Sequence, residues 1–175
     1  PPPLPPLRGS ALLSLTAPLG RAPLPSRTVF SVNLCACIDL VSAATVLGNF
    51  IGTDVTVATA LVTGEGIALV GAGAMIGGTA PGARNIISGN FYGVEFFGSS
   101  GNVVAGNWIG LDAAGAPIGN ASYGVRSFAN TQSTPTVLPS GNKIGGTDTG
   151  AGNAIASTAG QEEVLGTKTT APACA

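Results

Sequence analysis

The sequence contains no histidine and few charged residues of any kind. Without histidine the chain has no imidazole for a serine- or cysteine-type relay, and it lacks the commonest zinc ligand. Charged residues make up only 9% of the chain, which carries a net charge of -1 and no basic run. Binding to nucleic acid depends on a basic surface, so we expect no nucleic-acid partner.

Cysteine is also sparse, with three residues in the whole chain. They are Cys35, Cys37 and Cys174. An odd number with a single Cys-x-Cys pair forms no framework that recurs along the chain. We therefore expect no metal and no redox site from these residues.

The first 47 residues differ from the rest. They begin with a Pro-rich stretch, which favours an extended conformation and cannot enter the interior of a sheet. The apolar segment at residues 28–48 is interrupted by Asn33 and Asp39, so we predict no membrane span. We interpret residues 1–47 as a tail followed by either a cap on a repeat core or a signal-like segment.

What the chain does contain is a pair of repeated phrases. "GNFIGTD" at residues 48–54 returns as "GNWIGLD" at residues 106–112, and "IGGTAPGARNIIS" at residues 76–88 returns as "IGGTDTGAGNAIA" at residues 144–156. Three Gly-led stretches between them alternate apolar and polar residues at period two, as strands with one buried face do. These stretches begin at Gly66, Gly93 and Gly124.

Strands this short, joined by connections too tight for helices, cannot form the crossovers of an ordinary parallel sheet. A coil of three strands, each paired with its own kind in the next coil, satisfies all of them, so we predict an all-β parallel β-helix over residues 48–166. We expect residues 167–175 to form an irregular C-terminal tail. The predicted interior has three aliphatic columns: Ile51, Ile87, Ile109 and Ile155; Ile76, Val104 and Ile144; and Ile67, Val94 and Val125. A structural Asn ladder is predicted at Asn49, Asn85, Asn107 and Asn153.

The phrases "GNVVAGNWIGLDAAGAPIGN" and "IGGTAPGARNIISGN" resemble the repeats of secreted bacterial right-handed parallel β-helix proteins, which have the pectin-lyase-like fold. The resemblance covers about residues 48–157. It implies a right-handed solenoid of about three to four coils and a secreted or cell-surface location. In this fold group, repeat proteins of unassigned role stand beside polysaccharide lyases and glycoside hydrolases.

Asp54 and Asp112 end the repeated phrase and are the first catalytic candidates. An Asp at a turn can bond to backbone amides two residues on, which is the structural interpretation. Two coils of about 4.8 Å would put the carboxylates roughly 9 to 10 Å apart, at the outer limit for an inverting glycosidase. We favour the turn.

Glu95 and Arg126 are the second catalytic candidates, because they share an outward column in adjacent coils. Glu163 joins this column if the last strand still stacks. A surface charge ladder is the favoured interpretation. Resemblance to polysaccharide lyases would instead make Arg126 a base beside a calcium-bound carboxylate. Ca²⁺ is expected only in that case, and otherwise we predict no cofactor and no metal.

Phe50 and Trp108 are the predicted ligand-binding residues, since they face outward from the first type of strand. Such aromatic rings either stack on sugars or lie under the connections that follow them. Polysaccharide or cell-surface glycan is thus the predicted partner. A polar insertion at residues 129–141 is a further place for recognition. Open sheet edges at the ends of the helix predict end-to-end self-association.

These patterns lead to three functional hypotheses. The favoured one is a non-catalytic, secreted or cell-surface β-helix scaffold or adhesive module that contacts carbohydrate. The second is a polysaccharide-degrading enzyme, a lyase or a glycoside hydrolase. The third is a truncated fragment with no settled function.

Overall fold

The computed structural model describes residues 29–30, 36–54, 56–57, 60–61, 63–156 and 163–165. Every regular element in these ranges is a β-strand, and all pairings between named strands are parallel. The prediction of an all-β chain built from parallel strands is therefore confirmed. No described segment forms a helix of the length and apolarity that crossing a membrane requires.

The strands form three sheets, which we call the first, second and third sheet. The first contains β1 (Val29–Phe30), β4 (Phe50–Ile51), β7 (Ile86–Ile87), β10 (Trp108–Ile109) and β13 (Ala154–Ile155). The second contains β2 (Ile38–Leu40), β5 (Thr63–Leu69), β8 (Asn90–Phe97), β11 (Tyr123–Phe128) and β14 (Glu163–Leu165). The third contains β3 (Thr45–Val46), β6 (Met75–Gly77), β9 (Val103–Ala105) and β12 (Lys143–Ile144).

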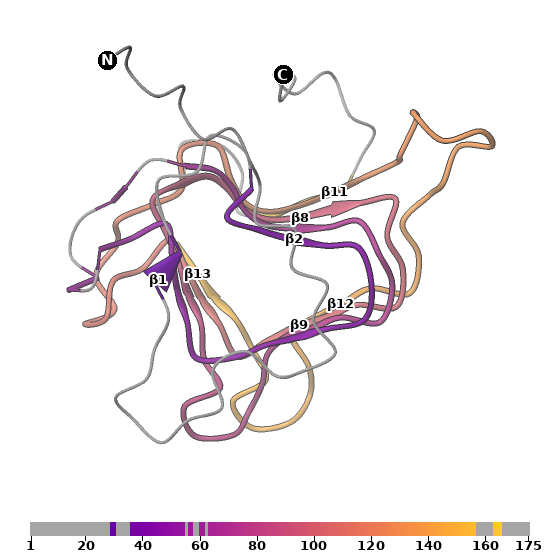
Figure 1. Ribbon diagram of the computed structural model, residues 1–175. Coiled ribbons are helices and arrows are strands. Elements are labelled where there is room, and N and C mark those ends of the chain that lie inside the picture. The colour runs from indigo at the N-terminus through magenta and orange to yellow at the C-terminus, as the bar shows by residue number, and fades with distance from the viewer. Residues whose placement is uncertain are drawn as a thin grey trace, which may run out of the picture.

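Each strand pairs with the strand three places along the chain, so the chain visits the three sheets in rotation. Figure 1 shows the result: successive coils lie over one another, and the three sheets enclose a common interior. This is the arrangement of a β-solenoid. Residues 38–46, which the sequence analysis placed before the repeats, contribute β2 and β3 to the second and third sheets.

The interior is built from the three predicted aliphatic columns, whose registers are confirmed. Ile51, Ile87 and Ile109 follow one another in the first sheet and are completely buried, and Ile155 extends them half-buried. The other two columns stack in the same way in the second and third sheets. Each fully buried side chain of this size contributes about 1.5 to 3 kcal/mol, so these columns are the main source of stability.

Asparagine side chains line three corners of the solenoid. Asn85 donates its backbone N–H and its side-chain amide to the Oδ1 atom of Asn107, at 3.2 and 2.9 Å. The same pattern links Asn49 to Asn85 and Asn107 to Asn153. Two further ladders, which the sequence analysis did not identify, join Asn90 to Asn120 and Asn102 to Asn142. The ladders satisfy backbone groups that the tight corners leave outside the sheets.

The recurring Ile-Gly pair marks the point at which a strand ends. Gly52 and Gly110 follow the first sheet, Gly77 and Gly145 follow core residues of the third, and all four have a positive φ, between 76° and 87°. Residues with a Cβ adopt this region at a cost, so glycine is the natural residue there. The repeated phrases thus encode corners of the solenoid.

Long loops alternate between two corners from coil to coil. Between the first and second sheets the connections are residues 52–62, then 88–89, then 110–122. Between the third and first sheets residues 78–85 form a long connection, and residues 106–107 form the short one in the next coil. The long connection returns at residues 145–153. Equivalent loops are therefore two coils apart, which explains why each phrase recurs only in every second coil.

Candidate functional site

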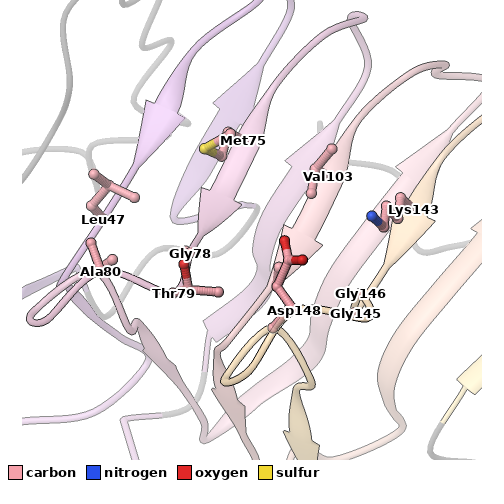
Figure 2. A pocket seen from close by; sticks show the side chains of 14 residues that line it. Leu47, Met75, Gly78, Thr79, Ala80, Val103, Lys143, Gly145, Gly146 and Asp148 are labelled. Carbon is pink, nitrogen blue, oxygen red and sulfur yellow. The ribbon is translucent and has the colours of Figure 1, made fainter.

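A groove with a volume of about 330 Å³ lies on the outer face of the third sheet. Its floor contains Met75 and Val103, which are paired in adjacent strands, and Lys143, which follows Val103 in register. Figure 2 shows these three side chains side by side on β6, β9 and β12, with the loops that flank them. A volume of this size is at the lower end of the range for small-molecule sites.

The walls of the groove are the two Ile-Gly-Gly-Thr loops, residues 77–84 and 145–152. Each loop closes with the same turn, in which Ala83 donates to the carbonyl of Ala80 and Ala151 to that of Asp148, both at 3.0 Å. Each is anchored to the coil before it, because Gly48 and Gly106 donate to the last alanine of the respective loop. The coil between them has only the short connection 106–107, which leaves a gap one coil wide.

The charged groups of the groove gather at one end. Lys143 and Asp148 are both exposed and lie on the side of β12, whereas Leu47, Met75 and Ala80 lie at the other end (Figure 2). The structure forms no ion pair between the Lys143 ammonium and the Asp148 carboxylate, although both line the groove. An oppositely charged pair at one end and an apolar floor at the other suit a small amphipathic ligand.

The sequence analysis did not select the residues of this groove. The sequence does contain a signal for the groove, because the Ile-Gly-Gly-Thr phrase occurs twice and a long connection follows each copy. Recognising the groove requires knowing that the two loops lie at the same corner of the solenoid and that the coil between them has only a short connection there. That is a property of three-dimensional stacking.

Asp54 and Asp112 begin loops, and both make short-range contacts there. The Oδ1 atom of Asp112 accepts from the backbone N–H groups of Ala114 and Ala116, at 2.8 and 2.7 Å. The carboxylate of Asp54 accepts from the Thr56 hydroxyl at 2.8 and 3.0 Å. β4 and β10 are separated by β7, so the two residues follow strands two coils apart. Asp112 thus makes the backbone contacts of a turn-forming aspartate, whereas the Asp54 carboxylate binds a side-chain hydroxyl two residues on.

Glu95 and Arg126 are paired in register on β8 and β11 and form an ion pair. The Arg126 Nε donates to Glu95 Oε2 at 2.7 Å, and Nη2 donates to the same oxygen. They do not form an exposed ladder: the residues are only 4% and 7% exposed, respectively. The guanidinium carbon of Arg126 lies 3.0 Å from the centre of the Tyr92 ring.

The expectation that Glu163 joins the column of Glu95 and Arg126 is wrong. The register pairs Arg126 with Val164 and places Glu163 opposite Val125. Glu163 is therefore not the partner of Arg126 in the register of the second sheet. The ion pair consists of Glu95 and Arg126. The rings of Tyr92 and Phe128 lie against its guanidinium group.

Phe50 and Trp108 share an outward column with Ile86 between them, and both aromatic side chains are half-buried. The guanidinium carbon of Arg84 lies 4.5 Å from the centre of the Trp108 ring, and Gly115 lies beside the outer edge of that ring. Arg84 is held there by a 3.3 Å hydrogen bond from its Nε to the carbonyl of Gly106. Trp108 thus carries a cation on its ring and lies next to the loop that follows it.

Among the described residues, no group of three histidine, cysteine, aspartate or glutamate side chains is arranged to hold a metal ion. Cys37 is buried in the core, where its thiol donates to the Oδ1 atom of Asn90 at 3.9 Å, while Cys35 and Cys174 lie outside the described residues. Comparison of the whole chain with protein-family models, with curated proteins and with solved structures finds no significant match.

Proposed function

We propose that the chain is a non-catalytic scaffold or adhesive module of a secreted or cell-surface protein and that it contacts carbohydrate. In this proposal it is a right-handed β-helix of the pectin-lyase-like type with about three to four coils. The proposal that the module is non-catalytic rests on one observation, which is that the candidate carboxylates bind other groups of the protein. Asp112 binds the backbone of its own loop, and Glu95 binds Arg126. These contacts hold the fold and give the carboxylates a structural role.

Contact with carbohydrate is supported by Trp108 and Arg84. A half-buried indole with a guanidinium over its ring offers an apolar surface for the C–H groups of a sugar and donors for its hydroxyl groups. Phe50, two strands away in the same column, would contact a second sugar unit. Two coils span about 9 to 10 Å, so a chain of several sugars is needed to reach both rings.

The experiment uses the fluorescence of Trp108, which is the only tryptophan of the chain. The full chain is titrated with neutral and acidic polysaccharides, and we expect a saturable shift of the emission with at least one of them. The matched variant Arg84→Met keeps an aliphatic stem over the ring but removes the donors, so it should bind several-fold more weakly. Emission unchanged by every polysaccharide would refute carbohydrate contact at Trp108.

The enzymatic alternative remains a prediction and has its own assay. The protein is incubated with the same polysaccharides, and new reducing ends and unsaturated products are measured. Our proposal expects neither. If cleavage occurs, and Asp54→Asn, Asp112→Asn or Glu95→Gln abolishes it while the variant remains folded by circular dichroism, the chain is an enzyme and the proposal is wrong.

A further inference from the structure

The groove of the third sheet lies beside one of the two corners at which long loops alternate. At both corners equivalent loops are two coils apart, so each corner has a gap over the coil between. At the corner between the first and second sheets, the gap over residues 88–89 is closed by the loops themselves. The Gly89 N–H donates to the carbonyl of Gly119 at 2.7 Å, and Ala60 packs against Gly89. The Ser88 hydroxyl donates to the carbonyl of Leu111 at 2.8 Å.

At the corner between the third and first sheets the two loops also meet over the short connection, since the carbonyls of Gly78 and Gly150 lie beside Gly106. Gly106 donates to the carbonyl of Ala151, but the loops at residues 77–84 and 145–152 leave the groove of about 330 Å³ between them. Met75 on its floor is 47% exposed, which is high for a large apolar side chain in the middle of a sheet face. The groove is thus open, has an apolar floor and is bounded by small residues.

The charges of Lys143 and Asp148 at one end of the groove restrict which ligands can bind in it. Lys143 folds back along its own loop, since its terminal Cε and Nζ atoms lie 3.5 Å from the position that a Cβ of Gly146 would occupy. Asp148 points into the groove from the same loop (Figure 2). The pair has one positive and one negative group at the mouth of an apolar slot, and the two are not joined to each other. A ligand with complementary charges at one end and an apolar tail at the other matches this pattern.

We propose that this groove binds a small zwitterion with an apolar tail, of the class of free apolar α-amino acids. At neutral pH such a molecule carries one ammonium and one carboxylate, both attached to the same carbon atom. The carboxylate binds the Lys143 ammonium, and the ammonium binds the Asp148 carboxylate. The side chain lies over Val103 and Met75. This inference does not depend on carbohydrate contact at Trp108, which lies on a different sheet.

The test uses the only methionine of the chain. Protein labelled with ¹³C at the methionine methyl group gives a single resonance, from Met75 on the floor of the groove. L-Leucine is expected to shift this resonance in a saturable way with a dissociation constant of about 1 mM. N-Acetyl-leucine lacks the cation and leucinamide lacks the anion, so each should bind at least about tenfold more weakly.

Variants identify the charges that act. Lys143→Gln should weaken leucine binding by about tenfold, and Asp148→Asn should do the same, because each removes one charge-assisted bond. Glu65→Gln, which removes a carboxylate from the second sheet, is the matched control and should bind leucine normally. Circular dichroism verifies that each variant is folded.

Three results would overturn the inference. One is the absence of any shift with leucine up to about 50 mM. Another is an equal shift with leucine, N-acetyl-leucine and leucinamide, which would make the groove an apolar surface without selection for charge. The third is a shift with cellobiose or maltose but not with leucine. That outcome would move carbohydrate contact into the groove and leave the scaffold proposal intact.

Discussion

Replacing Asn107 by alanine should destabilise the protein more than its small change in volume suggests. Asn107 is completely buried and lies in the middle of the longest Asn ladder. Its side-chain amide donates to the carbonyls of Ile76 and Ala105 at 2.9 and 3.1 Å and to the Oδ1 atom of Asn153 at 3.1 Å. Its Oδ1 accepts two hydrogen bonds from Asn85.

The magnitude follows from the groups that the substitution leaves without a partner. The backbone N–H of Asn85 and one N–H of its side-chain amide lie at a buried corner and lose their bonds to the Asn107 Oδ1 atom. A buried polar group without a partner costs about 1 to 3 kcal/mol. Two such groups predict a loss of roughly 3 to 4 kcal/mol, once the partial relaxation of the corner is allowed for. This is a large fraction of the roughly 5 to 15 kcal/mol that stabilises a typical domain.

Urea unfolding followed by circular dichroism measures this loss without relying on Trp108, which is next to the substituted residue. The matched control is Asn130→Ala, because the Asn130 side chain accepts one bond from the Gln132 N–H at an exposed site. The control should cost less than about 1 kcal/mol. If Asn107→Ala costs no more than Asn130→Ala, the ladder does not hold the corner and our account of it is wrong.

Two further substitutions test the corners and the buried ion pair. Gly77→Ala should be strongly destabilising, because its Cβ would overlap the carbonyl of Ala105. Gly82→Ala, at a similar φ with open space around it, is the control and should cost only about 1 to 2 kcal/mol. If thermal unfolding shows similar losses of stability for the two variants, the steric part of this reasoning is wrong. Arg126→Met should destabilise by about 3 kcal/mol, since it removes the partner of a buried carboxylate. The double variant with Glu95→Leu should recover part of that loss, and an additive double variant would refute the coupling.

The core of the fold was predictable from the sequence because its signals are local and periodic. Alternation at period two fixes which face of a strand is buried, and the repeated phrases fix which strands stack. Ile51, Ile87 and Ile109 could therefore be placed in one column before the structure was known. The ladders at Asn90 and Asn102 were missed because their partners, Asn120 and Asn142, lie in connections that the repeated phrases do not include.

The environment of Glu95 and Arg126 was not predictable in the same way. Period two correctly places the two side chains in one column and facing out of the sheet, and an outward face was taken to be exposed. Their burial depends on aromatic neighbours such as Tyr92 and Phe128, whose rings lie over the Arg126 guanidinium. A single sequence shows which side a residue points to, but it does not show what covers that side.

The alternation of loops connects the repeat to recognition. A solenoid with the same loop in every coil would cover its corners completely, and one without loops would present flat faces. At two of its three corners this chain places a long loop in every second coil, so equivalent loops there are separated by a distance set by the spacing of the strands. Loops meet over both short connections, at Gly89 and at Gly106, and on the outer face of the third sheet they leave the groove with Lys143 and Asp148 at one end. Substituting loop residues should therefore change what the protein binds without changing how it folds, because the stability resides in the aliphatic columns and the ladders.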